Sequence, residues 1–276
     1  MMSNAMDDVG VRHSLAGDGI RYWTWGADPC DGTTCVFLFH GITSAHRFWK
    51  PMACELAARG LSVIAWDMAF HGESRRSGSF SLSQAADDAA AILCQEGVSS
   101  CVAVGHSFGC YVVQALAVGH PECVRGAVLF DGTPCGYPLK PLEVWSIRHY
   151  SALAALWPFG SYVRQGSSAV STTETGRREF AEELSELGRP GMLAATRACY
   201  PAALEALAAP LPEGLPVTLV LGEKDDVGLV APAMRGWADE LGVELEFVPG
   251  AGHNSPWDQP ERCLGIVLDA TGAGRS

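Results

Sequence analysis

The stretch Val102-Ala103-Val104-Gly105-His106-Ser107-Phe108-Gly109-Cys110 decides the fold of this chain. Its first residues are an apolar run typical of a buried strand, and the pattern of residues 111–118 is typical of a helix. Between them lies Gly-x-Ser-x-Gly, centred on Ser107. Two glycines let the chain turn sharply, so the serine can occupy a strained backbone position and point away from the sheet. The stretch therefore predicts a nucleophilic serine at a strand-to-helix turn.

The segments on both sides of this turn alternate between strand and helix patterns. Strands are expected at residues 35–39, 61–66, 102–106, 126–130, 217–221 and 244–248, and two short antiparallel strands between residues 11 and 25. Helices are expected at about 47–59, 83–95, 111–118, 233–241 and 259–269. Parallel strands covered on both faces are continuously apolar and are joined by helices. The alternation predicts an α/β fold with a doubly wound, mostly parallel sheet.

This alternation stops between residues 132 and 211. The segment contains no convincing strand, an aromatic cluster in its first part, and amphipathic helices expected at about 173–187 and 191–207. We interpret it as a helical insertion over one end of the sheet. The predicted core domain consists of residues 6–131 and 212–276, because residues 1–5 resemble a cloning remnant.

Composition excludes several classes of function. A net charge of −12 disfavours nucleic acid as a partner. No apolar run reaches the ~18 residues of a membrane span, and no secretory signal is present, so we expect a cytoplasmic protein without a membrane partner. The ten cysteines lack a CxxC pair and are expected to be reduced thiols, with Cys30 and Cys35 as the strongest candidates for an exception.

Two loops after later strands can supply the partners that a nucleophilic serine needs. Such a serine needs a base that takes its proton and a group that orients the base. Asp225 follows the strand at 217–221, and His253 follows the strand at 244–248. Both belong to the same carboxyl edge of the sheet as Ser107. The order Ser107, Asp225, His253 is the one expected for a strand-to-helix nucleophile turn.

Two other acids compete with Asp225 for the orienting role. Asp226 is adjacent, but a shift of one residue aims a loop side chain elsewhere. Asp131 also ends a strand at the same edge, where a role in the turn is the favoured interpretation. Both alternatives remain open at this point.

The segment after the strand at 35–39 is expected to complete an oxyanion hole. The backbone N–H groups of Ile42 and Phe108 would hold the developing negative charge. A substrate pocket is expected nearby, and its candidate residues are His40, Gly41, His46, Phe70, Trp145 and Trp157. His40 and His71 also suit turn-stabilising roles, His46 suits a helix start, and His106 is expected to pack into the sheet. The remaining histidines show no ligand spacing, so neither a metal site nor a cofactor is predicted.

These motifs resemble those of the α/β-hydrolase superfamily, in the branch with a helical cap after the sixth of eight strands. The resemblance rests on His40-Gly41, Asp67 with His71-Gly72-Glu73-Ser74, the stretch around Ser107, Gly222-x-x-Asp225 and Gly252-His253. Phe70 departs from the glycine usual at the start of the His-Gly-x-Ser loop, which borders the cap.

The resemblance implies a serine hydrolase. A serine nucleophile argues against epoxide hydrolases and haloalkane dehalogenases, and favours cleavage of a small, mainly apolar carboxylic ester, thioester or lactone through an acyl-enzyme on Ser107. The alternatives are a C–C bond hydrolase of ring-cleavage products and a non-enzymatic ligand sensor on the same scaffold.

Overall fold

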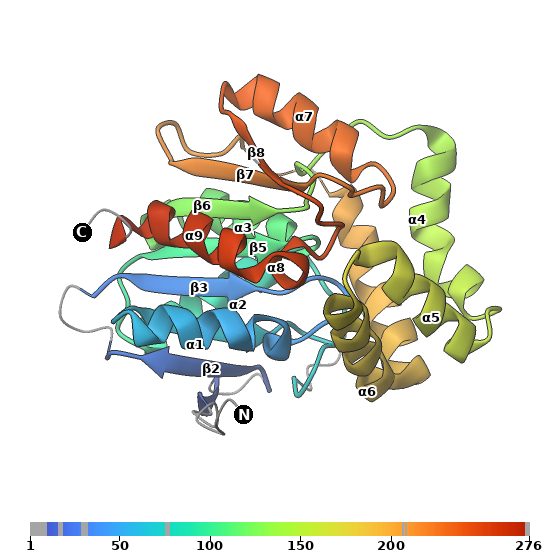
Figure 1. Cartoon of the computed structure of the whole chain (residues 1–276), viewed down its shortest axis with the longest axis horizontal. Helices are drawn as coiled ribbons and strands as arrows, with labels where there is room; N and C mark the ends of the chain where they lie inside the picture. The colour runs from blue at the N-terminus through green and yellow to red at the C-terminus, as the bar shows by residue number, and fades with distance from the viewer. Residues whose placement is uncertain are drawn as a thin grey trace.

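An eight-stranded sheet with the order β1-β2-β4-β3-β5-β6-β7-β8 lies at the centre of the computed structural model (Figure 1). The structure describes residues 10–15, 19–28, 33–74, 78–205, 207 and 209–273. The strands are β1 Val11–Ser14, β2 Arg21–Gly26, β3 Cys35–Phe39, β4 Ser62–Asp67, β5 Cys101–His106, β6 Val124–Phe130, β7 Val217–Gly222 and β8 Leu245–Val248. β2 is antiparallel to β1 and β4, and all other neighbours are parallel. The predicted α/β sheet is confirmed.

Helices cover both faces of this sheet. The core helices are η1 His46–Trp49, α1 Lys50–Ala58, α2 Leu82–Gln95, α3 Gly109–Gly119, η2 Pro121–Cys123, α7 Val230–Leu241, α8 Ser255–Asp258 and α9 Pro260–Thr271. Side chains of α1 and α9 pack in one apolar cluster, and side chains of α2, α3 and α7 pack in another. Within β3, Phe37 belongs to the second cluster and Val36 to the first, so both faces of the strand are buried. This double burial explains the continuously apolar sequence of β3.

Four helices lie between β6 and β7, at the right of the sheet in Figure 1. They are α4 Pro141–Ala154, α5 Phe159–Val170, α6 Glu174–Cys199 and η3 Tyr200–Leu204. The two expected helices correspond to α6, whose backbone leaves the helical region at Gly188 (φ 69°, ψ 168°), two residues before Pro190. We call residues 132–211 the cap, although the domain boundaries stay a prediction. Ala154, Leu184 and Met192 form the centre of its own apolar cluster.

The described residues also show the state of the cysteines and the character of the helices. The nine cysteines at described positions are free thiols, while Cys30 lies outside the described residues. No helix within the described ranges is long and apolar enough to cross a membrane.

Candidate active site

Ser107 lies at the turn between β5 and α3, at the carboxyl edge of the sheet. Its φ of 51° is in the left-handed region, which a side chain other than glycine rarely adopts. A Cβ added to Gly109 would lie 2.3 Å from the carbonyl oxygen of Phe39. A Cβ added to Gly105 would lie 2.9 Å from the backbone nitrogen of Cys110. The two glycines are therefore required for the close approach of β5, α3 and β3 around the serine.

A chain of hydrogen bonds connects Ser107, His253 and Asp225. The Oγ of Ser107 lies 2.9 Å from Nε2 of His253, and Nδ1 of His253 lies 2.9 Å from Oδ2 of Asp225. The other carboxylate oxygen of Asp225 accepts a hydrogen bond of 2.9 Å from the backbone N–H of Val227. Asp226 is exposed, so Asp225 is the acid that the loop after β7 brings to the histidine. A serine bonded to an imidazole that a carboxylate orients is the arrangement that general-base activation requires.

The surroundings of His253 favour its protonated form. Burial lowers the pKa of the imidazole, but the hydrogen bond to Asp225 and the charges of Asp225 and Asp131 outweigh burial, so the pKa lies above its ordinary value. The imidazolium that forms when His253 accepts the serine proton is stabilised by the same two carboxylates.

Asp131 does not contact the imidazole. Its carboxyl group is fully buried and accepts hydrogen bonds from the N–H of Gly222, at 2.7 Å, and from Oγ of Ser255, at 2.5 Å. Gly222 ends the strand before Asp225, and Ser255 lies two residues after His253. Burial raises the pKa of Asp131 to about 7, although the neighbouring His253 opposes the shift. Asp131 thus ties together the two loops that carry Asp225 and His253.

The loop after β3 passes directly beside Ser107. A Cβ added to Gly41 would lie 3.3 Å from the Cβ of Ser107. In the part of the chain that the structure describes, neither the N–H of Ile42 nor the N–H of Phe108 donates a hydrogen bond. Phe108 immediately precedes α3, so its N–H belongs to the free first turn of that helix. Both N–H groups are available to an anion beside the serine.

Three buried histidines hold backbone around the site. Nε2–H of His106 donates a hydrogen bond of 2.8 Å to the carbonyl oxygen of His253. Nε2 of His40 accepts a hydrogen bond of 3.0 Å from the N–H of Met68, and Nδ1–H of His71 donates one of 3.0 Å to the carbonyl oxygen of Ala69. Burial lowers the pKa of His106 and of His40 to about 3. These side chains are therefore neutral and structural at neutral pH.

The structure does not bring four of the predicted pocket side chains to Ser107. His40 is fully buried in its turn. Nδ1 of His46 lies 2.9 Å from Oδ1 of Asp67, and the imidazole ring of His46 stacks on Trp23. Trp145 and Trp157 lie on the exposed side of α4 and of the turn that follows it, with about half of each side chain accessible. α4 packs against the cap cluster through Tyr150 and Ala154, so its opposite face points outward.

Apolar side chains do surround the serine turn. Ile42 and Phe70 are partly buried against the apolar cluster that contains Phe108. The backbone of Phe70 has a φ of 72°, which glycine adopts without strain and a residue with a side chain rarely adopts. This strained position is where α/β hydrolases usually have glycine. Phe80 and Tyr111, which the sequence patterns did not single out, have ring centroids 5.6 Å from that of Phe108. Tyr111 lies three residues after Phe108 on α3, whereas Phe80 is distant in sequence and only the fold brings it to Phe108.

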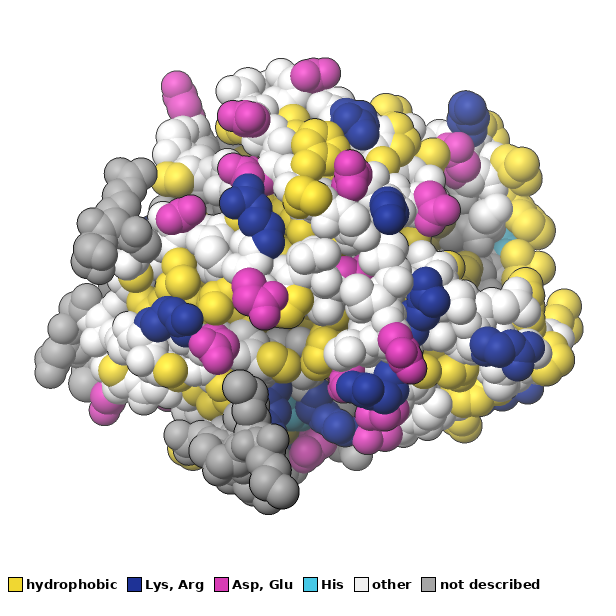
Figure 2. Space-filling model, in the orientation of Figure 1, with side chains coloured by type: hydrophobic (Ala, Val, Ile, Leu, Met, Phe, Trp, Pro, Cys, Tyr) yellow, Lys and Arg dark blue, Asp and Glu magenta, His cyan; other side chains and the backbone are white. Residues whose placement is uncertain are grey.

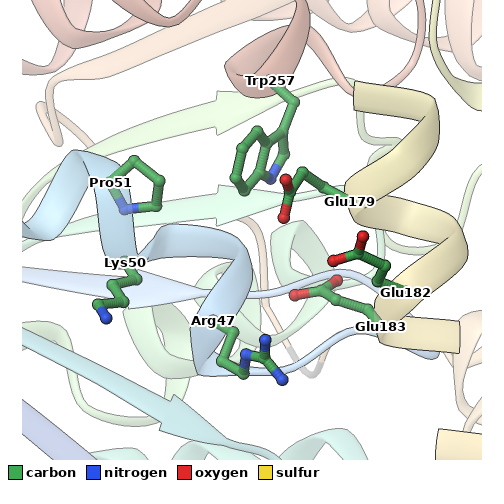
Figure 3. Close-up of a pocket in the computed structure, with 7 residues that line it drawn as sticks. All are labelled: Arg47, Lys50, Pro51, Glu179, Glu182, Glu183 and Trp257. Carbon is green, nitrogen blue, oxygen red and sulfur yellow. The ribbon is translucent and has the colours of Figure 1, made fainter. Parts of the chain in front are cut away.

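A pocket of about 210 Å³ lies where the cap meets the core (Figure 3). Its lining residues are Arg47, Lys50, Pro51, Glu179, Glu182, Glu183 and Trp257. Oγ of Ser44, two residues after Ile42, donates a hydrogen bond of 2.6 Å to Glu183. Burial raises the pKa of Glu183 to about 8. The pocket is lined by neither Ser107 nor His253, so it adjoins the candidate site without containing it.

Asp258 joins the cap to the loop of His253. Its carboxylate accepts hydrogen bonds from the N–H groups of Gly252 and Thr172, at 2.8 Å and 2.9 Å, and of Thr173, at 3.1 Å. The hydroxyl groups of Ser171, Thr172 and Thr173 also donate to it. These hydrogen bonds lower the pKa of Asp258 even though burial opposes them. The sequence carries no signal of this contact, because residues 171–173 lie more than 80 positions away.

Among the described residues, no group of three His, Cys, Asp or Glu side chains is arranged to hold a metal ion.

Comparison with known proteins identifies the family. Residues 36–266 match the family model described as the alpha/beta hydrolase family. The chain belongs to this family. The α/β hydrolase is 26% identical to Lipase LipV of Mycobacterium tuberculosis over 254 residues, which cover 87% of this chain and 94% of that protein.

Solved structures share the fold of this α/β hydrolase. One is a thermophilic esterase from Thermogutta terrifontis, with a TM-score of 0.73, 22% identity, and coverage of 97% of this chain and 99% of that one. Another is the enol-lactonase from Burkholderia xenovorans LB400, with a TM-score of 0.74, 17% identity, and coverage of 95% and 100%. At such low identity these likenesses establish the fold, and the family supports hydrolase activity without fixing the bond that is cleaved.

Proposed function

We propose that this α/β hydrolase cleaves a small, mainly apolar carboxylic ester through an acyl-enzyme on Ser107. The observation that carries the proposal is the hydrogen-bonded chain from Ser107 Oγ through His253 to Asp225, with 2.9 Å at each step. The names of the relatives, a lipase and an esterase, agree with this class of reaction.

In the proposed reaction, His253 Nε2 takes the proton of Ser107 while Oγ attacks the carbonyl carbon of the ester. Asp225 holds the imidazole in the tautomer that leaves Nε2 free to accept a proton. The N–H groups of Ile42 and Phe108 receive the oxyanion of the tetrahedral intermediate. The imidazolium then protonates the leaving alcohol as its C–O bond breaks, and the acyl group stays on Ser107.

The second half of the proposed reaction returns the enzyme to its starting state. His253 takes a proton from a water molecule whose oxygen attacks the acyl carbon, and a second oxyanion forms beside the same N–H groups. Collapse of this intermediate releases the carboxylic acid, and the proton on His253 returns to Oγ of Ser107.

The preference for an apolar substrate rests on the side chains around the serine turn. The rings of Phe80 and Tyr111 lie 5.6 Å from that of Phe108, and Ile42 follows Gly41, which lies beside Ser107. A pocket with mostly apolar walls and a few aligned polar groups is typical of small-molecule sites. The net charge of −12 also disfavours strongly anionic substrates.

Hydrolysis of p-nitrophenyl butyrate by the wild type and by Ser107→Ala tests the proposal. We expect kcat to fall by at least about 10³-fold in the variant, since nothing else supplies the nucleophile. Ser168→Ala, at an exposed hydroxyl on α5, is the matched control and should retain wild-type activity.

A fluorophosphonate probe followed by peptide mapping tests the nucleophile directly. Labelling at Ser107 supports the proposal, and labelling at another residue contradicts it. Turnover of a vinylogous 1,5-diketone with all esters inert would replace it by C–C bond hydrolysis. Tight ligand binding without measurable turnover of any ester would instead indicate a ligand sensor.

A further inference from the structure

The outer face of the cap carries most of the exposed large apolar side chains in the described part of the chain. Seven large apolar side chains are exposed among the described residues, and five of these seven lie between residues 142 and 157. They are Leu142 (73% exposed), Trp145 (49%), Leu153 (46%), Leu156 (83%) and Trp157 (48%), which we call the α4 face. Clustered exposed apolar groups mark a surface that another body covers.

The spacing of these residues explains why they form one surface. Leu142, Trp145 and Leu153 lie on one side of α4, because residues separated by three, four, seven or eight positions share a helix face. Tyr150 and Ala154 lie on the adjoining side of α4 and pack against the rest of the cap. Figure 2 shows the hydrophobic side chains along the right-hand margin, over α4 and the turn to α5, on the side away from the sheet.

A basic pocket lies beside the α4 face. It has a volume of about 170 Å³, lies between α4, α6 and η3, and is lined by Arg148, Arg197, the hydroxyl-bearing Ser151 and Thr196, and four apolar or proline residues. No carboxylate lines this pocket. Among the described residues, neither Arg148 nor Arg197 forms an ion pair. The pocket therefore carries local positive charge in a chain whose net charge is −12.

We propose that the α4 face docks on an anionic phospholipid surface. Its leucine and tryptophan side chains would enter the boundary between headgroups and acyl chains, where amphipathic helices bind and tryptophan is favoured. Arg148 and Arg197 would receive lipid phosphates in the pocket beside them. The sequence predicted no membrane partner because no spanning segment is present, but docking from one side requires no such segment.

The charges favour a lipid surface over a second copy of the chain. Two copies that meet through the α4 face in a symmetric dimer would bring the arginines of one pocket toward those of the other. Such like charges oppose association, whereas anionic headgroups attract both arginines.

Flotation with vesicles tests the docking. We expect the protein to float with vesicles of phosphatidylcholine and phosphatidylglycerol at 3:1, and not with phosphatidylcholine alone, and to be released by high salt. In Arg148→Gln/Arg197→Gln, partition should weaken by about 30-fold, which corresponds to about 2 kcal/mol at about 1.4 kcal/mol per tenfold change. Leu153→Ser/Leu156→Ser should abolish flotation. Arg59→Gln, at the exposed residue directly after α1, and Val11→Ser, at an exposed residue of β1, are the matched controls and should bind like the wild type.

Four outcomes overturn the proposal. The first is no flotation with any vesicle, and the second is equal flotation with neutral and anionic vesicles. The third is a concentration-dependent dimer without lipid binding, which Leu153→Ser/Leu156→Ser converts to monomers. The fourth is binding of soluble glycerol phosphate without binding to vesicles. The α4 face contains no residue of the candidate site, so each variant should hydrolyse a soluble ester like the wild type. That activity shows that the variants are folded and separates this proposal from the ester hydrolase proposal.

Discussion

Replacing Gly109 by alanine tests whether the close packing around the serine turn positions the proposed oxyanion hole. The added Cβ would lie 2.3 Å from the carbonyl oxygen of Phe39 and 2.8 Å from that of His40. An ordinary contact begins at about 3.4 Å, so α3 and the end of β3 must separate by about 1 Å. The two donors on either side of that contact, Ile42 and Phe108, would then be too far apart to hold one oxyanion.

The expected loss of activity in Gly109→Ala follows from that displacement. A misplacement of about 1 Å in a reacting constellation costs on the order of 10²-fold in rate, and the loss of one oxyanion donor costs about 10²–10³-fold. The overpacking itself costs about 1–3 kcal/mol of stability, of which alanine regains up to about 1 kcal/mol through its helix propensity. Gly109→Ala should therefore lose about 10²-fold in kcat/KM while its Tm falls by only a few degrees.

Gly119→Ala on the same helix is the matched control. No atom lies within 4 Å of a Cβ added to Gly119, so its Tm should rise slightly and its activity should not change. Thermal unfolding and hydrolysis of p-nitrophenyl butyrate measure both effects. If Gly109→Ala retains kcat/KM within about threefold of the wild type, the glycine does not hold the donors in place and the reasoning is wrong.

Three further predictions concern the acids around His253. Asp225→Asn should lower kcat by about 10³–10⁴-fold, whereas the exposed neighbour in Asp226→Asn should not change it, and equal losses in the two variants would refute the assignment of the acid. Because the pKa of His253 is raised, kcat/KM for a neutral ester should rise with pH around a midpoint above 6.5, and a midpoint below that value in the pH–rate profile would show that the carboxylates do not outweigh burial. Because burial raises the pKa of Asp131 to about 7, the native state binds the proton of this group more tightly than the unfolded chain, and the contribution of Asp131 to stability falls between about pH 4 and pH 7. Asp131→Asn has no such carboxyl group. Measured by urea unfolding, its free energy of unfolding should rise relative to that of the wild type by up to about 4 kcal/mol over that pH range, and a difference that does not change with pH would disprove the raised pKa of Asp131.

Much of the fold could be predicted from local patterns because both faces of the parallel strands are covered. β3 is apolar at every position, and β7 and β8 end at glycine-rich loops that carry Asp225 and His253. The order of these loops along the chain predicted Ser107, Asp225 and His253 as partners, with Asp226 and Asp131 open as alternatives to Asp225, and hydrogen bonds connect the three in the structure.

The rest depended on contacts between distant segments. The aromatic residues at the start of the cap suggested a pocket, but α4 and the turn after it expose Trp145 and Trp157, and periodicity cannot say which side of a helix meets solvent. Phe80 is separated from Phe108 along the chain by α2 and β5, so no spacing rule connects the two rings. The bridging role of Asp131 was equally hidden, because its partners lie about 90 and 120 positions further along the chain.

The six hydrogen bonds to Asp258 fasten the cap to the loop that carries His253. They join residues 171–173, directly before α6, to Gly252, the residue directly before His253. The cap is therefore part of the support of the general base, and a substitution at residues 171–173 would disturb His253 although these residues lie about 80 positions from it along the chain.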